Sequence, residues 1–126
     1  MTSKLELYKC KVCTNLIEVV KDGVGTLVCC NEEMSLLQTL MPNETDAHYA
    51  HLEILDEMTK KITFNHPMNS EHYIEFIEVI SKDEKYVKRK YLCIDEKPEI
   101  VFKCECKEGF WVRIYCNIHG VLKTVL

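Results

Sequence analysis

The sequence predicts an all-β protein in which a small metal-binding module precedes an antiparallel β-sandwich. Three observations support this prediction. Short segments rich in Ile, Val, Tyr and Phe recur from residue 48 onward, separated by Asp, Lys, Gly and Pro. Half of the eight cysteines lie close together near the N-terminus. The length of 126 residues suits a module of about 40 residues joined to a larger domain.

Residues 1–37 form the predicted module. It contains turn signals at Asp22-Gly23 and Gly25, and too few apolar residues to build a core of its own. A bound metal ion would therefore supply much of its stability. Residues 38–47, around Met41-Pro42-Asn43, are predicted to be a linker, and one or two helical turns are expected within residues 32–41.

The second predicted domain covers residues 38–126. Seven short strands separated by turn residues in one stretch of chain are typical of an antiparallel sandwich. The expected strands are 48–55, 60–65, 72–81, 85–93, 99–105, 110–116 and 121–125.

Composition and charge exclude several classes of protein. Hydrophobic residues make up 47% of the chain, which is too many for a disordered protein. The formal net charge of −4 disfavours nucleic-acid binding. No apolar run approaches the roughly 20 residues that cross a membrane, and the N-terminus has no apolar stretch typical of a signal peptide. We therefore expect a cytoplasmic protein, in which the cysteines bind metal rather than form disulfides.

The first candidate metal site is a set of four cysteines. Cys10 and Cys13 have the spacing of a metal-binding turn, and Cys29 and Cys30 follow as an adjacent pair. Four thiolates suit zinc or a single iron ion, and thiolates alone do not decide between them. The adjacent pair is unusual, because most zinc ribbons use a second Cys-x-x-Cys motif.

The second candidate site combines histidines with one cysteine. His66 precedes Pro67, which restricts His66 to an extended conformation in a loop or at a sheet edge. Cys116 and His119 would face one metal ion if residues 116–119 formed a tight turn, and Gly120 suits the positive φ needed to leave it.

Three further histidines lie near this motif in the sequence. His72 precedes an apolar strand. In a strand over 48–55, His48 and His51 would lie on opposite faces, so only one would reach the site, and periodicity does not choose between them.

The motifs in this order resemble the desulfoferrodoxin family, the two-iron form of superoxide reductase, over essentially the whole chain. Tyr8-Lys9-Cys10 and Cys29-Cys30 resemble its desulforedoxin-like module. The stretch from His66-Pro67-Met68 through His72 to Ile77-Glu78 is similar to its second-site segment, and residues 115–120 (Tyr-Cys-Asn-Ile-His-Gly) are similar to its C-terminal motif.

The resemblance implies two iron centres and an immunoglobulin-like sandwich. One iron would be held by four cysteines in the N-terminal module. The second would have four equatorial histidines and one axial cysteine. Carried over by position, these ligands are His48, His66, His72, His119 and Cys116. The resemblance selects His48 over His51, because Asp46-Ala47-His48 precedes an apolar strand with Glu53 at the matching distance.

The implied activity is the one-electron reduction of superoxide to hydrogen peroxide. Four neutral imidazoles and one thiolate leave Fe(II) with a net positive charge and an open position that attracts a small anion. The thiolate would favour electron transfer to bound oxygen, and Asn117 and the backbone near Cys116 are candidates for tuning the potential. The resemblance also implies a rubredoxin-like electron donor and a homodimer.

The chain departs from the family at one important place. The family has a Glu-Lys pair before the first histidine ligand, where this chain has Asp46-Ala47. The lysine is understood to attract superoxide and help deliver a proton, and the glutamate to bind the oxidised iron. Ala47 can do neither of the lysine's tasks, so we expect slower capture of superoxide. Lys60 or Lys61 would have to supply the missing charge.

Other residues have no role in the resemblance. Cys93, Cys104 and Cys106 are expected to be free thiols, with a redox or extra metal role as the alternative. A basic run, Lys82, Lys85, Lys88, Arg89 and Lys90, is expected to be a solvated face, with docking of an acidic electron donor as the alternative.

Two other functions remain open on the sequence. Ala47 favours an iron protein of electron transfer or redox sensing with weakened superoxide activity. Zinc in the first site would instead favour a structural or metal-storage module.

Overall fold

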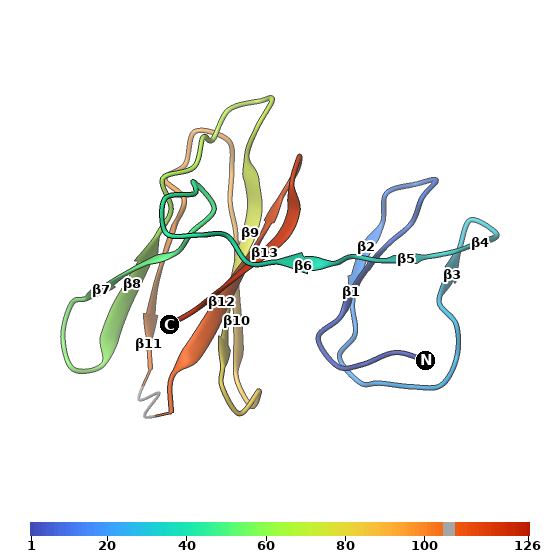
Figure 1. Cartoon of the computed structure of the whole chain (residues 1–126), viewed down its shortest axis with the longest axis horizontal. Coiled ribbons are helices and arrows are strands. Elements are labelled where there is room, and N and C mark those ends of the chain that lie inside the picture. The colour runs from blue at the N-terminus through green and yellow to red at the C-terminus, as the bar shows by residue number, and fades with distance from the viewer. Residues whose placement is uncertain (105–107) are drawn as a thin grey trace. The chain divides into compact units, whose positions relative to one another are not determined.

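The structure, a computed structural model, describes residues 1–104 and 108–126, and every regular element within those two stretches is a β-strand (Figure 1). The all-β prediction is therefore confirmed. The expected helical turns within residues 32–41 are wrong, because short strands occupy that stretch. The chain divides into two compact units, Met1–Gln38 and Thr39–Leu126. No helix that could span a membrane occurs among the described residues.

The first unit is a small sheet with a two-stranded ribbon. Its sheet has the order β2-β1-β5, made by β1 (Leu7–Lys9), β2 (Leu16–Glu18) and β5 (Ser35–Leu36), and the ribbon pairs β3 (Val28–Cys29) with β4 (Glu32–Glu33). The buried apolar side chains described in this unit are Leu5, Leu7, Cys10 and Val19. So small a core cannot offset the conformational entropy of ordering the unit, which agrees with a metal-dependent module.

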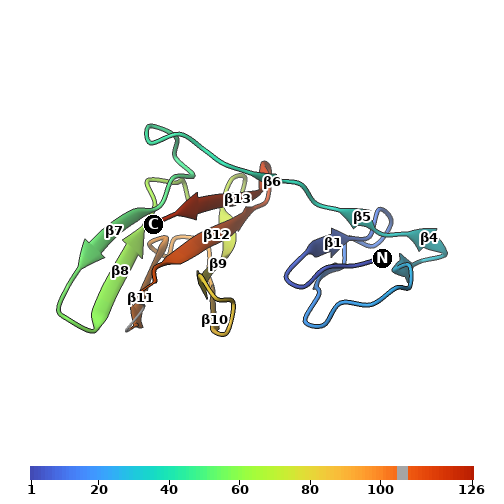
Figure 2. The same cartoon turned by 60° about the horizontal axis from the view of Figure 1, so that its bottom comes forward.

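The second unit is a sandwich of two sheets, visible as separate layers in Figure 2. The larger sheet has the order β10-β9-β12-β13-β6, and the smaller has the order β11-β8-β7. The strands are β6 (Thr39–Leu40), β7 (His51–Ile54), β8 (Thr59–Thr63), β9 (Ile74–Ser81), β10 (Val87–Tyr91), β11 (Glu99–Lys103), β12 (Phe110–Cys116) and β13 (Gly120–Val125). All pairs are antiparallel except β13 with β6.

Alternation along the strands places the core between the two sheets. Ile77 and Val79 of β9 lie beside Ile114 and Val112 of β12, and all four belong to one buried cluster. The smaller sheet contributes Ile62, Ile100 and Phe102 to the same cluster, and Phe64, directly after β8, also belongs to it. The sandwich expected from the sequence is thus confirmed, with a continuous apolar core of its own.

The other face of the larger sheet buries an ionic network. The Glu78 carboxylate is fully buried and accepts hydrogen bonds from Arg113 Nε at 2.7 Å and Arg89 Nη2 at 2.8 Å. Because both oxygens of Glu78 have a cationic donor, the charge is compensated within the sheet. Glu78 belongs to the motif that resembles the second-site segment, and here it ties β9 to both neighbouring strands.

Two boundaries differ from the sequence prediction in ways that matter for the site. The predicted strand 48–55 begins only at His51, so His48 lies in the preceding turn and strand periodicity does not apply to it. The predicted linker 38–47 contains β6, which pairs with β13. This pairing was not predicted, because two residues carry no periodic pattern.

Candidate metal centres

The four N-terminal cysteines gather into one cluster. The sulfur atoms of Cys10, Cys13, Cys29 and Cys30 all lie within 4.8 Å of one another. Cys13 Sγ lies 3.5 Å from Cys29 Sγ, and Cys29 Sγ lies 3.9 Å from Cys30 Sγ. Four converging sulfurs are a ligand set for zinc or a single iron ion.

Left-handed backbone conformations bring these sulfurs together. Adjacent residues of a regular strand point to opposite faces of the sheet, so in such a strand the sulfurs of Cys29 and Cys30 could not both face one metal ion. Cys30 has a φ of 52° and Asn31 a φ of 62°, and this turn aims both thiols at the cluster. Thr14, with a φ of 66°, follows the turn of residues 11–13, which connects Cys10 to Cys13.

The thiols of this cluster differ in pKa. The backbone N–H groups of Cys13 and Val12 each donate to Cys10 Sγ at 3.4 Å, and they lower the pKa of Cys10 to about 6. Hydrogen bonds with Cys13 and Cys29 raise the pKa of Cys30 to about 12. Four thiolates so close together need a cation to ionise at neutral pH, and a bound metal ion would provide it.

Removing one of these cysteines should unfold the first unit. We expect Cys13→Ser to lose the metal of this site and to raise the rate of proteolysis within residues 1–38 by about ten-fold or more, because metal binding supplies the folding energy of so small a unit. Limited proteolysis followed by mass spectrometry measures this. Lys11→Ser, an exposed position in the same turn, is the matched control. Equal cleavage rates for both variants would contradict the expectation.

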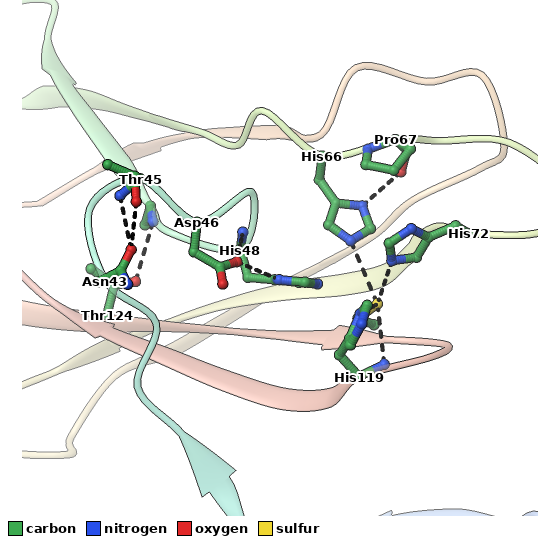
Figure 3. Close-up of polar contacts among 11 residues, drawn as sticks. Asn43, Thr45, Asp46, His48, His66, Pro67, His72, His119 and Thr124 are labelled. Atoms are coloured by element: carbon green, nitrogen blue, oxygen red, sulfur yellow. Dashed lines mark hydrogen bonds and ion pairs between the residues drawn. The ribbon is translucent and has the colours of Figure 1, made fainter.

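The second cluster lies at one end of the sandwich. Ligand atoms of His48, His66, His72 and Cys116 lie within 4.8 Å of one another. His119 belongs to the same group of rings, with its centroid 4.7 Å from that of His48 and 5.1 Å from that of His72 (Figure 3). The structure thus brings together all five residues expected from the sequence, whereas His51 lies exposed on β7.

Three ring nitrogens surround the Cys116 sulfur. The Sγ atom lies 3.2 Å from His72 Nε2, 3.5 Å from His66 Nε2 and 3.5 Å from His119 Nδ1. The backbone N–H of His119 also points to this sulfur, at 3.5 Å. Cys116, His48 and His66 are buried, whereas His72 is half-buried and His119 is exposed, so the cluster is closed to water only on the side of the core.

In His48 and His66, the Nδ1 atom has a hydrogen-bond partner outside the cluster, and the Nε2 atom is left to bind a metal ion. His66 Nδ1 lies 2.6 Å from Pro67 O, and His48 Nδ1 lies 2.6 Å from Asp46 Oδ1. His48 Nε2 is buried without a hydrogen-bond partner. A buried polar atom normally has a hydrogen-bond partner. A metal ion bound by the cluster would be the partner of this inward-facing nitrogen. The residues therefore fit a metal ion of the kind that imidazole and thiolate bind.

Two local devices position Cys116 and His119. The strand pairing of β12 with β9 shifts register between Tyr115 and Cys116, and such a bulge re-aims a side chain. Residues 117–119 then form the turn of the β12–β13 hairpin, and Gly120 leaves it with a φ of 79°. The tight turn and the positive φ expected from the sequence are both confirmed.

Asn117 connects this hairpin to the segment that carries His72. Its Oδ1 accepts from Tyr73 N at 2.8 Å, its Nδ2 donates to Glu71 O at 3.0 Å, and its backbone N–H donates to Tyr73 O at 3.1 Å. The sequence made Asn117 a candidate for tuning the potential of the metal. Its hydrogen bonds show that it connects the segment that bears His72 to the hairpin that bears Cys116 and His119.

The two units match two sequence profiles in the same order. The profile of the desulfoferrodoxin N-terminal domain matches residues 2–37, and that of the main desulfoferrodoxin domain matches residues 40–125. The chain belongs to the desulfoferrodoxin family. Its all-β fold, with a desulforedoxin-like module and a superoxide reductase-type sandwich, agrees with this membership, and the two clusters match the two iron centres of the family.

Individual proteins support the assignment over the whole chain. The chain is 40% identical to a desulfoferrodoxin homolog of Methanothermobacter thermautotrophicus, across 96% of this chain and 98% of that protein. It is 37% identical to the desulfoferrodoxin of Desulfarculus baarsii, across 98% of each. The fold is similar to that of the superoxide reductase from Treponema pallidum, with a TM-score of 0.72, 20% identity, and 96% and 98% of the two chains covered.

Lys60 and Lys61, the two lysines that could supply the charge absent at Ala47, each have a partner within the unit. Lys60 Nζ donates to Cys104 O at 3.1 Å, and Lys61 Nζ pairs with Glu99 Oε2 at 2.9 Å. Both side chains are therefore occupied along β8 and β11. Position 47, in the turn before His48, is an alanine and carries no charge.

The basic run lies at the far end of the larger sheet from the cluster. It surrounds the β9–β10 hairpin, whereas the β12–β13 hairpin carries Cys116 and His119 at the other end (Figure 1). Ile74–Ser81 spans about 23 Å at the usual strand rise. Arg89 and Lys90 also have acidic partners within the unit, Glu78 and Glu96. These observations favour the solvated face over a docking patch next to the metal.

The three extra cysteines do not behave alike. Cys93 is exposed and free, and its backbone N–H donates to Glu96 Oε2. The expectation that Cys104 is a free thiol is wrong, because it is disulfide-bonded. Cys106 lies outside the described residues.

Burial keeps the inner histidines neutral. It lowers the pKa of His66 to about 4, from an ordinary value near 6.5, and it lowers the pKa of His72 in the same direction. In metal-free protein, folded His66 therefore stays neutral between about pH 6.5 and 4, where an unfolded chain takes up the proton. Stability should fall as the pH drops through this window, by at most about 1.4 kcal/mol per pH unit from this residue.

Urea unfolding of metal-free protein at several pH values measures this effect. His66→Asn should show a shallower loss of stability over the same window, because it removes the group that titrates differently in the two states. The same pH dependence in both proteins would show that other groups cause the loss.

Proposed function

We propose that this member of the desulfoferrodoxin family is a superoxide reductase, which reduces superoxide to hydrogen peroxide at a non-haem iron held by His48, His66, His72, His119 and Cys116. The observation that carries the proposal is the convergence of four imidazole rings on one buried thiol, with three ring nitrogens 3.2 to 3.5 Å from its sulfur. The orphaned His48 Nε2 adds a fourth inward-facing donor. Four neutral donors and one anionic donor suit Fe(II).

The overall reaction consumes one electron and two protons for each superoxide. A bound Fe(II) ion would supply the electron, and hydrogen peroxide would leave after two protons are taken from solvent. An external donor then returns the electron. We propose a rubredoxin-like protein as that donor and the cytoplasm as the location.

The residues around the cluster perform three tasks in this scheme. Burial lowers the pKa of His66 and of His72, so these two rings stay neutral. An imidazole that binds a metal ion is neutral, so the ligand set would carry a single negative charge. The Cys116 thiolate supplies that charge, and the His119 N–H stabilises it at 3.5 Å. Asn117 holds the two segments that bear His72 and Cys116 in register, so that both contribute to one site.

The four-cysteine cluster has a separate proposed role. Cys10, Cys13, Cys29 and Cys30 would hold a second iron in the first unit, and this centre would accept or store one electron at a time. We further propose that the protein is a homodimer, as the family resemblance implies. Light scattering coupled to gel filtration measures the mass in solution.

A second function is favoured by the replacement of the family's lysine before His48. Ala47 supplies no cation in the turn next to His48, and the side chains of Lys60 and Lys61 are bonded to Cys104 O and Glu99. An iron protein of electron transfer or redox sensing, with weakened superoxide chemistry, would retain both clusters and lose fast capture.

Pulse radiolysis separates these functions. A superoxide reductase should oxidise its second iron in a bimolecular reaction with superoxide, at a rate proportional to protein concentration, and should yield one peroxide for each superoxide consumed. Dismutation would yield one peroxide for every two superoxide ions, with release of oxygen. Oxidation no faster than spontaneous dismutation would favour the electron-transfer function instead.

A further inference from the structure

The turn before His48 is held by hydrogen bonds within itself. Asn43 Oδ1 accepts from Thr45 N at 3.1 Å and Thr45 Oγ1 at 2.8 Å. The Asp46 backbone N–H donates to Asn43 O at 3.0 Å, and its carbonyl accepts from Tyr49 N at 3.1 Å. The backbone of Asp46 is therefore fixed on both sides.

The turn is also attached to the larger sheet. Ala50 N donates to Thr124 Oγ1 of β13 at 3.2 Å, and both residues are buried. This contact joins residues 43–50 to the strand that follows the hairpin of Cys116 and His119. The side chains of the turn therefore have a defined position relative to the cluster.

A single oxygen of Asp46 meets two donors of His48. Asp46 Oδ1 accepts from His48 N at 2.8 Å and lies 2.6 Å from His48 Nδ1. The contact to N is an Asx turn, which a short carboxylate makes with the residue two positions later. Figure 3 shows Asp46 on the side of the His48 ring away from His66, His72 and His119.

These contacts define the tautomer of His48. A carboxylate only accepts hydrogen bonds, so the proton of a neutral His48 lies on Nδ1 and its lone pair on Nε2. Nε2 is the buried atom without a partner. A carboxylate behind a histidine ligand fixes the orientation of the ring and strengthens the ligand.

We infer that Asp46 is a positioning residue for His48, which holds the ring in the metal-binding tautomer and orientation, and that it is not itself a ligand of the iron. The inference rests on the proposed iron site, and it assigns to Asp46 a different task from the glutamate that the family places one residue before its lysine. The Oδ1 atom of Asp46 already contacts two nitrogen atoms of His48. Asp46 also lies on the side of the His48 ring away from the other three histidines (Figure 3).

The first test is the proton on His48 in the full-length chain loaded with zinc, which is diamagnetic. Long-range ¹H–¹⁵N correlation spectra should show a protonated Nδ1 on His48 with a strongly downfield, slowly exchanging proton. This proton signal should disappear in Asp46→Ala and persist, less shifted, in Asp46→Asn, whose amide oxygen can still accept. A His48 protonated on Nε2, or a signal unchanged by Asp46→Ala, would overturn the inference.

The second test is the affinity and potential of the second iron. Asp46→Ala should weaken Fe(II) binding by about 10- to 100-fold, the range found when an outer-shell partner is removed, and Asp46→Asn by less. Both should raise the midpoint potential read from the thiolate-to-iron band, because a negative charge behind the ligand is lost. Glu44→Gln removes a charge from an exposed position of the same turn and is the matched control.

The outcomes distinguish the inference from the proposed function. An equal rise in potential in Glu44→Gln and Asp46→Asn would mean that general charge, not the bond to His48, causes the shift, and would overturn the inference. If the spectra and affinities are as expected but the reaction with superoxide is slow, the positioning role of Asp46 is supported and the proposed function is contradicted.

Discussion

Replacing Cys116 with serine should abolish the blue-green absorption of the oxidised second iron and reduce the rate with superoxide by more than about 100-fold. The sulfur lies at the centre of the cluster, between His66, His72 and His119. Its loss removes the single anionic donor and the charge-transfer transition that only a thiolate provides. Loss of an outer-shell group typically costs about 10- to 100-fold, so loss of this ligand should cost more.

Two measurements check this expectation, the visible spectrum after oxidation and the rate by pulse radiolysis. The red absorption of the four-cysteine centre should be unchanged, because that cluster lies in the other unit. Cys93→Ser, at an exposed free cysteine, is the matched control and should change neither spectrum nor rate. A blue-green band that persists in Cys116→Ser would show that another thiol binds the iron.

Introducing a lysine at position 47 should speed the capture of superoxide by about ten-fold at low ionic strength. A cation close to an anion-binding site raises the local concentration of substrate, and even a single charge acts within a Debye length. The chain has a formal net charge of −4, and Lys60 and Lys61 are held by partners on neighbouring strands. Ala47→Lys therefore adds a positive charge in the turn next to His48.

The bimolecular rate of Ala47→Lys should also fall more steeply with added salt than that of the natural chain. Ala47→Gln, which has similar bulk without the charge, should behave like the natural chain in both respects. If Ala47→Lys leaves the rate and its salt dependence unchanged, electrostatic steering does not limit capture in this protein.

The pattern of cysteines and the strand periodicity predicted most of the fold. Strands such as β9 and β12 alternate over many residues, so their existence and facing sides follow from the side-chain period of two. The Cys-x-x-His-Gly turn was predictable because a glycine at a hairpin exit signals a positive φ, and Gly120 has one. These features depend on residues close together in the sequence.

Features set by contacts distant in sequence, or by a local backbone conformation that residue type does not signal, were not predicted. The first histidine was assigned to a strand, but His48 lies in a turn, and its place in the cluster comes from the attachment of that turn to β13 through Thr124. The bond between Asp46 and His48 depends on the same turn. The left-handed conformation of Cys30, which lets two adjacent cysteines share one cluster, has no signal in residue type either.

The most direct test of the two iron sites is a visible absorption spectrum of anaerobically purified protein, oxidised in two steps. We predict red charge-transfer bands from the four-cysteine iron after mild oxidation, and an added blue-green band from Cys116 bound to Fe(III) after stronger oxidation. Red bands alone would contradict the claim that the histidine–cysteine cluster holds iron. A colourless protein would contradict both iron sites and would leave zinc, or no metal, in a structural module.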